Sequence, residues 1–391
     1  MHPIFPFALA VIFVIANGIP QLYFAKSLGF KLKPTGLAFM VGAVGNLVTG
    51  TVVPISAQAE TLTMAGQMKK MPERIMGLLI AAAVGIVMGL TGSIGSIVDF
   101  AGSSTINAMM AGVGFILTWV AISMVKKEPR TGLISIFFAL LIYFTTHNLV
   151  YTIAGSVFIS SFDFVAIQKR RISFAEISKE VDFGEGNGDY GNENEEWRFW
   201  KGSYWSDFKL LKPKLTAAAV FGGLSFICLN IGANISFGSI TSSIAGVEPN
   251  IDALTVINSV ADIPAVLFGG APLEAIISGT AEAPDLGGIS GPWLAAVVMM
   301  AVFGVLVLLG VVSKLGRYIP AESIAGFLLI IGFFVTVVPG LGRAFAVGGD
   351  PAAAAVALGV TVLSKNAFFG LVAGLLIYQL PQWIDILFPL F

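Results

Sequence analysis

The chain has 391 residues, of which 56% are hydrophobic and only 12% are charged, and its mean hydropathy is +0.88. Soluble domains carry about 25% charged residues, so this composition excludes a water-soluble enzyme and predicts a protein embedded in a lipid bilayer. The formal net charge of −1 provides no basic surface for nucleic acid, which excludes DNA and RNA as partners.

Fourteen hydrophobic segments follow one another along the chain, and a membrane-spanning helix needs about 20 mostly apolar residues. In chain order the segments are 5–24, 35–53, 55–67, 74–91, 104–125, 131–146, 148–161, 215–237, 253–268, 272–283, 292–313, 321–339, 351–364 and 366–380. We therefore predict an all-α polytopic membrane protein with about 14 transmembrane segments. Segments 3 and 10 (55–67 and 272–283) are too short to span as straight helices.

A polar and aromatic loop, 163–214, separates the first seven segments from the last seven. Its middle, 184–196, is rich in Gly, Asn and Glu, which is typical of flexible chain. The aromatic run 197–205 alternates with charge and suits a helix lying at the membrane interface. A small folded loop that covers the transporter is the alternative interpretation.

The two halves of the chain resemble each other in three places that occur in the same order. The matched stretches are AGVGFILTWVAI (from Ala111) with AGFLLIIGFFVTVV (from Ala325), GTVVPISA (from Gly50) with FGGAPLEA (from Phe268), and THNLVYTIAG (from Thr146) with SKNAFFGLVAG (from Ser364). Their offsets are similar: 214 for Ala111 and Ala325, 218 for Pro54 and Pro272, and 219 for Gly155 and Gly374. Seven segments is an odd number, so the second half enters the membrane from the opposite side. We predict a 7+7 inverted repeat, which is a feature of secondary transporters.

The basic residues are distributed unevenly between the two sides of the membrane. Of the 22 Lys and Arg residues, all except Arg343 lie in loops that follow odd-numbered segments. The positive-inside rule therefore predicts that these loops and the 163–214 insert are cytoplasmic and that both termini face outward. The predicted location is the cell membrane.

Polar residues at membrane depth concentrate in segments 3 and 10, between Pro54 and Gly66 and between Gly269 and Glu282. Each stretch begins with Gly and Pro, which break a helix. We expect each chain to continue as a half-helix whose free N–H groups carry a partial positive charge at mid-membrane. Two facing half-helices would enclose a polar pocket between the repeats.

Glu60 and Glu274 are the carboxylates that we expect at this pocket. They would accept hydrogen bonds from a substrate, and removal from water would favour a bound coupling proton. The alternative is that each faces a water-filled vestibule or caps a helix. Asp262 either braces the second break or belongs to a proton path. The remaining predicted substrate-binding residues are Asn17, Gln58, Asn230, Asn234 and Ser278.

Asn230 and Asn234 share one helix face, and amides there either recognise a substrate or join two membrane helices. His147-Asn148 and Lys365-Asn366 are interpreted as equivalent turns, because Asn is a common turn residue. The chain has only two histidines, which argues against a His-based metal site, and no catalytic constellation is visible. We predict no enzyme activity, no metal and no cofactor other than a coupling ion, H⁺ or Na⁺.

Three further stretches carry a family resemblance. They are FALAVIFVIANGIPQLYFAKSLGF in segment 1, SVADIPAVLFGGAPLEAIISG across segments 9 and 10, and RYIPAESIAGFLLIIGFF at segment 12. Together they resemble the nucleobase–cation symporters, most closely the adenine/guanine/hypoxanthine permease branch, over nearly the whole chain except 163–214. The chain departs from that family at Asn230 and Asn234, where an acidic residue is usual, and at Ser278, where Glu is usual.

This resemblance implies a core domain built from 1–100 and 215–318 and a gate domain built from 101–162 and 319–391, with dimer contacts through the gate. It implies a proton-coupled secondary transporter of a nucleobase that works by moving the core against the gate. Two alternatives remain open. One is an inorganic or organic anion transporter of the same fold, in which half-helix N-termini bind the anion. The other is a non-transporting sensor or scaffold that works through the 163–214 loop.

Overall fold

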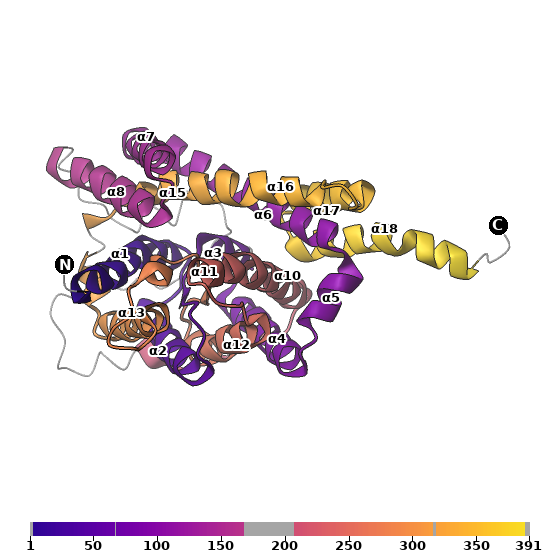
Figure 1. Cartoon of the computed structure of the whole chain (residues 1–391), viewed down its shortest axis with the longest axis horizontal. Helices are drawn as coiled ribbons and strands as arrows, with labels where there is room; N and C mark the ends of the chain where they lie inside the picture. Colours follow the sequence, from indigo (N-terminus) through magenta and orange to yellow (C-terminus); the bar gives the residue numbers. More distant parts are fainter. Residues whose placement is uncertain (1–2, 67, 168–206, 316–317, 388–391) are drawn as a thin grey trace.

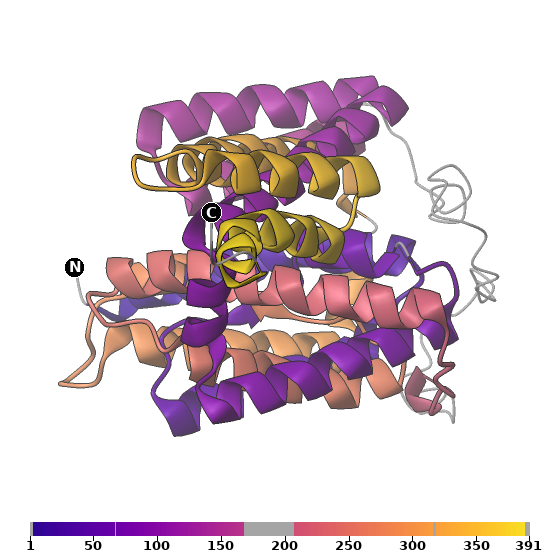
Figure 2. The ribbon, with the colours of Figure 1, turned by 90° about the vertical axis from the view of Figure 1, so that its right-hand side faces the viewer.

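The computed structural model describes residues 3–66, 68–167, 207–315 and 318–387, so most of the predicted 163–214 loop lies outside the described residues. The described chain forms two layers of helices (Figure 1). Figure 2 shows the same layers stacked, with the smaller one uppermost. The helix α5 (Ile94–Ala101) connects them.

The larger layer combines helices from both halves of the sequence. They are α1 (Ile4–Ser27), α2 (Leu32–Thr49), α3 (Ala59–Gly66), α4 (Met71–Thr91), α10 (Ala217–Ala233), α11 (Ser239–Ile244), α12 (Ile251–Leu267) and α13 (Gly291–Leu308). A π-helical turn, η3 (Asn234–Gly238), joins α10 to α11, and α14 (Val311–Leu315) follows α13. Two short strands, β1 (Ile55–Ser56) and β2 (Glu274–Ala275), and a 3-10 turn, η4 (Gly279–Glu282), complete the layer.

The smaller layer is likewise built from both halves. It contains α6 (Ser103–Lys127), α7 (Pro129–Thr146), α8 (Leu149–Phe162), α15 (Ala325–Leu329), α16 (Val338–Ala344), α17 (Pro351–Ser364) and α18 (Ala367–Leu387). The 3-10 turn η6 (Ala321–Ile324) and the π-helical segment η7 (Ile330–Val337) join α15 and α16 into one helical unit, and the π-helical turn η1 (Asp163–Ile167) follows α8.

Every predicted segment coincides with a helix, a pair of short helices or a broken stretch of the structure, whereas α5 was not predicted. Within the described residues, seven helices are long and apolar enough to cross a membrane. This is a multi-pass membrane protein, and the count of fourteen crossings stays a prediction.

The half-helix expected in segment 10 is wrong, whereas segment 3 does contain the helix α3. Residues 274–275 are extended, and only the four-residue 3-10 turn η4 follows them. The cause is local. Ile276 and Ile277 are β-branched and suit extended chain, while Pro284 comes too soon for a longer helix to form.

The equivalent turns predicted at the ends of segments 6 and 13 are confirmed. His147 and Lys365, which end α7 and α17, have positive φ angles of 51° and 52°. The side chains of Asn148 and Asn366 then each accept a hydrogen bond from a main-chain N–H three residues further on. These two turns differ by 218 in sequence position.

The same offset of 218 relates Gly114 in α6 to Gly332 in η7, and these two glycines contact each other through their backbones. The alignment of Ala111 with Ala325, at an offset of 214, was therefore one helical turn out of register. A shift of four residues preserves the helix face, which explains why the small residues still matched. Helix pairings also recur in both halves: α2 packs on α13 as α12 packs on α4. This pattern is consistent with an inverted repeat.

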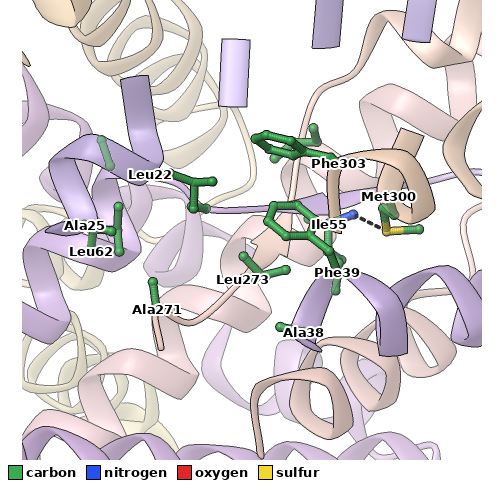
Figure 3. Close-up of a cluster of buried hydrophobic side chains, with 14 of the residues drawn as sticks. Leu22, Ala25, Ala38, Phe39, Ile55, Leu62, Ala271, Leu273, Met300 and Phe303 are labelled. Atoms are coloured by element: carbon green, nitrogen blue, oxygen red, sulfur yellow. Dashed lines mark hydrogen bonds between the residues drawn. The ribbon is translucent and has the colours of Figure 1, made fainter. Parts of the chain in front are cut away.

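The largest apolar cluster draws most of its residues from the larger layer, includes β1 (Figure 3), and continues into α6, α8 and α15 of the smaller layer. Ile55 lies among Phe39 of α2 and Phe303 of α13, whose ring centroids are 4.7 Å apart. Leu22 of α1 and Leu62 of α3 belong to the same cluster. Extended chain at mid-membrane is therefore enclosed by protein, as the absence of water there requires.

We predict that Gly114→Ala destabilises the protein, because the Gly332 carbonyl oxygen lies 2.6 Å from the position that the new Cβ would occupy. Forcing α6 and η7 apart should cost about 1–3 kcal/mol, the usual range for overpacking. A lower thermal unfolding midpoint in detergent would show it. Gly359→Ala is the matched control, since no atom lies within 4 Å of its Cβ position and Ala is the better helix former. Equal midpoints for the two variants would contradict the proposed close contact.

Candidate functional site

The two broken segments meet in an antiparallel pair at the centre of the larger layer. β1 pairs with β2 so that Ile55 lies opposite Ala275 and Ser56 opposite Glu274. Ser56 and Glu274 also differ by 218 in position, as do Pro54 and Pro272. Residues that would be equivalent in the repeat therefore face each other, which is consistent with a two-fold axis between the halves at this pair.

The first break is held by neighbouring helices. The Asn46 side chain on α2 donates a hydrogen bond from Nδ2 to the Val53 carbonyl oxygen at 2.8 Å. The Ile55 main-chain N–H donates to the Met300 Sδ of α13 at 3.4 Å, as Figure 3 shows. Because helix breaks leave main-chain groups without helical partners, these side chains replace the missing bonds.

The second break is held in the same way. Asp262 on α12 accepts a hydrogen bond from the Leu273 N–H at 2.8 Å, and Thr35 on α2 accepts one from the Ala271 N–H at 2.8 Å. Asp262 is buried, and this bond fixes the chain immediately before β2. Of the two roles considered for Asp262, the structure provides direct support for bracing.

The helix α3 begins next to this pair. Its first regular hydrogen bond runs from the Leu62 N–H to the Gln58 carbonyl oxygen at 2.9 Å, so the N–H groups of the first turn have no partner within the helix. Glu60 is the second residue of α3 and therefore lies at its positive end. Across the pair, the Ser278 hydroxyl caps η4 by accepting from the Thr280 N–H at 3.2 Å.

Several side-chain oxygens near this pair are buried and lack a hydrogen-bond partner among the described residues. They belong to Asn17 and Gln21 of α1, to Gln58 and Glu60 at the start of α3, and to Glu274 of β2. Both carboxylate oxygens of Glu60 and of Glu274 are in this state. Burying a polar group without a partner costs about 1–3 kcal/mol, and more for a charge, so this cluster is suited to bind something.

The elements that carry these oxygens pack against one another, since α1 contacts both α3 and η4. Glu60 and Asp262 both lie close enough to Glu274 to act on it electrostatically. Thr61 is also near Glu274, although its hydroxyl donates to the Gln58 carbonyl oxygen at 2.9 Å. Within the described part of the chain, none of the three carboxylates forms a salt bridge.

Asn230 and Asn234 lie in a hydrogen-bonded network with α12. Asn234 Nδ2 donates to Asn230 Oδ1 and to Thr255 Oγ1, both at 2.9 Å, and Asn234 Oδ1 accepts from Asn258 Nδ2 at 2.7 Å. The Asn234 amide is thus fully used between helices. This geometry favours the interhelical alternative for Asn234 over direct substrate contact.

Sequence reasoning missed Gln21, which is 1% exposed and has an unpartnered oxygen beside that of Asn17 on α1. The available signal was its spacing, because Gln21 comes four residues after Asn17 and so shares its helix face. The bracing residues Thr35 and Asn46 were also missed. Nothing in their local sequence indicates that they contact distant main chain.

No family model matches the chain, and no curated protein matches it. Several solved structures share its fold. The transmembrane domain of a cyanobacterium bicarbonate transporter, BicA, superposes with a TM-score of 0.59 at 14% identity, covering 95% of this chain and 96% of that one. SLC26A9 superposes with a TM-score of 0.59 at 12% identity, covering 96% of this chain and 65% of that one. The murine SLC26A9 anion transporter in its inward-facing state gives 0.53 at 15% identity, covering 94% and 68%.

These neighbours are membrane transporters rather than enzymes, which is consistent with the expectation of no enzyme activity. They are anion transporters, so the assignment to the nucleobase–cation symporters is wrong. One of the stretches that suggested it contains the helix break around Pro272, which reports on the fold. Identities of 12–15% show the fold alone.

We predict that Asp262→Asn retains both stability and transport, because an amide oxygen can still accept the Leu273 N–H. Asp262→Leu should lower stability by about 1–3 kcal/mol, since the buried N–H would lose its acceptor. Thermal unfolding and solute uptake should be measured on both variants. If Asp262→Asn keeps its unfolding midpoint but loses transport, the bracing role is insufficient and the proton-path alternative is supported.

Proposed function

We propose that the chain is a secondary active transporter of a small anion, which binds where β1, the start of α3 and β2 meet. The observation that carries the proposal is the pairing of Ser56 with Glu274, because it brings both broken segments to one point on the axis between the repeats. Substrate sites of inverted-repeat transporters lie at such breaks near the bilayer midplane. The described anion transporters share this fold, which supports the choice of substrate class.

The N-terminus of α3 supplies the attraction for an anion. Its first-turn N–H groups carry a partial positive charge of about +0.5 and have no partner inside the helix. The amides of Asn17, Gln21 and Gln58, whose oxygens have no partner among the described residues, lie on elements around it and offer N–H donors when their side chains rotate. This donor set fits a small oxyanion or halide.

Glu60 and Glu274 oppose an anion when they are ionised. Two like charges 4 Å apart repel by about 4 kcal/mol at an effective dielectric constant of 20. We therefore propose that both carboxyl groups bind protons before or together with the anion and then donate hydrogen bonds to it. The coupling ion in this proposal is H⁺, and proton and anion move in the same direction.

The two layers would move against each other as core and gate. We retain the boundaries 1–100 and 215–318 for the core and 101–162 and 319–391 for the gate. A cluster between the layers joins Met64 of α3 and Leu229 of α10 to Met109 and Met110 of α6. Methionine side chains are flexible and repack easily, so this contact is suited to sliding. A dimer through the gate and cytoplasmic basic loops remain part of the proposal.

Binding of an anion should raise the thermal unfolding midpoint of the purified protein. At a concentration 100 times the dissociation constant, the stabilisation should be about 2.7 kcal/mol. The panel should contain bicarbonate, sulfate and chloride as sodium salts at constant ionic strength, with adenine, guanine, hypoxanthine and uracil as the opposing set. A midpoint that rises with a nucleobase and with no anion would overturn the proposal.

Uptake into proteoliposomes should increase as the pH on the entry side falls, because only the protonated carboxyl groups accept the anion. The limiting slope is roughly tenfold per pH unit for each proton required. Glu60→Gln combined with Glu274→Gln should bind the anion with no pH dependence and should fail to concentrate it, since an amide cannot exchange a proton.

Glu282→Gln is the matched control, because Glu282 is an exposed glutamate eight positions beyond Glu274. It should retain the pH dependence of the unmodified protein. An unchanged pH profile in the double variant would remove the two carboxyl groups from the coupling step.

A further inference from the structure

Arg343 lies at one end of the helical unit that runs from Ala321 to Ala344 (24 residues, about 36 Å). At the other end, Glu322 pairs with Lys127, the last residue of α6, at 3.8 Å. Lys127 belongs to the loops in which the basic residues concentrate. Arg343 therefore lies on the opposite face of the membrane protein.

That face is otherwise acidic. Of the Lys and Arg residues in the described part of the chain, Arg343 alone follows an even-numbered segment. The acidic residues after even-numbered segments, in α5 and at the end of segment 10 are Asp99, Glu248, Asp252, Glu282, Asp285, Asp350 and Asp385. The Arg343 side chain is exposed and forms no ion pair with any described residue. An anion that approaches this face meets a single local positive charge.

Arg343 also lines two cavities at once. The wider cavity, about 210 Å³, is bordered by Arg343, Ser103, Ser104, Asp350 and Tyr378. It has room for several water molecules at about 10–15 Å³ each, and hence for a hydrated small anion. Asp350 lines the same cavity but forms no ion pair with Arg343 among the described residues, and its Oδ1 accepts the Ala352 and Ala353 N–H groups at the start of α17.

The narrower cavity, about 20 Å³, has room for about one water molecule and lies between the two layers. Ser236 and Phe237 of η3 line it from the larger layer, and Thr336 of η7 lines it from the smaller layer. Thr336 is 7% exposed, and its buried hydroxyl has no hydrogen-bond partner among the described residues. Two π-helical segments thus meet at this constriction, and π-helical turns are frequent at functional sites.

The constriction leads toward the central site, because η3 also packs against β2, which carries Glu274. Three features therefore follow one another: the wide cavity with Arg343, the narrow cavity with the Thr336 hydroxyl, and the β1–β2 pair. We propose that Arg343 and the wide cavity form an entry site for a small anion, which passes between η3 and η7 to reach β2. This inference rests on the proposed anion transport and adds a second binding site to it.

The test is uptake of isotopically labelled bicarbonate, sulfate and chloride into proteoliposomes at low and high ionic strength. Arg343→Gln should raise KM roughly tenfold at low ionic strength while kcat stays unchanged, because a lone charge concentrates the substrate at the entrance. The difference should shrink at high ionic strength, where exposed charges are screened. Arg343→Lys should keep most of the affinity. Lys209→Gln removes an exposed charge on the opposite face and should leave KM unchanged.

Arg343→Cys provides an independent test of the charge at this position. A positively charged, membrane-impermeant thiosulfonate reagent, added to one side only, should restore a low KM, and a negatively charged one should raise it further. The unmodified protein treated with the same reagents controls for reaction at Cys228.

Thr336→Val tests the passage, since it removes the hydroxyl at nearly constant shape and should lower kcat. If the unmodified protein transports an anion but Arg343→Gln leaves KM unchanged, the entry site is overturned and the proposed function stands. If the unmodified protein transports and binds none of the three anions, the proposed function itself fails.

Discussion

The structure depends on one constraint: main chain that leaves helical form at mid-membrane must still satisfy its hydrogen-bonding groups. The chain meets this constraint by pairing the two breaks with each other, Ser56 opposite Glu274, and by bracing each break from a neighbouring helix. The braces come from α2 and α12, which occupy equivalent places in the two halves. The polar groups at the centre are therefore there mainly to hold the two breaks. The carboxylate oxygens of Glu60 and Glu274 are the exception, because they have no hydrogen-bond partner among the described residues.

Much of this architecture could be predicted from the sequence, because its signals are local. The lengths of the hydrophobic runs located the segments, and prolines with glycines shortly before them located the breaks at Pro54 and Pro272. The turns at His147 and Lys365 were also local features, and their spacing of 218 is the exact offset of the repeat. Glu60 and Glu274 could be selected on the cost of burying a charge. Side-chain roles that depend on contacts with another segment could not be predicted from the sequence. Thr35 and Asn46, which hold the main chain at the two breaks, are examples.

The same limit explains the wrong family assignment. The stretch before Glu274, with its Ala-Asp pair and Gly-rich break, resembled a nucleobase transporter, yet its Asp262 braces the Leu273 N–H. The fold requires the residues that build a helix break, whichever substrate the protein carries. Only the side chains that remain unpartnered after the break is built can report on the substrate. Asn234 was predicted to contact the substrate, but its amide forms hydrogen bonds with Asn230, Thr255 and Asn258.

Charge at the central site constrains how any anion can be moved. The end of α3 contributes a partial charge of about +0.5, which one ionised carboxylate already exceeds. No described salt bridge compensates Glu60 or Glu274, so an anion added to two ionised groups would bring three negative charges into one buried place. Binding one proton at each carboxyl leaves a single negative charge facing the helix end, which is the arrangement that the helix can stabilise. Proton binding and anion binding must then favour each other equally, because linkage between two sites is reciprocal. The proposed entry site at Arg343 lies on the other side of the η3–η7 constriction. It would separate the capture of a charged substrate from the step at which the carboxyl groups bind protons and lose their own charge.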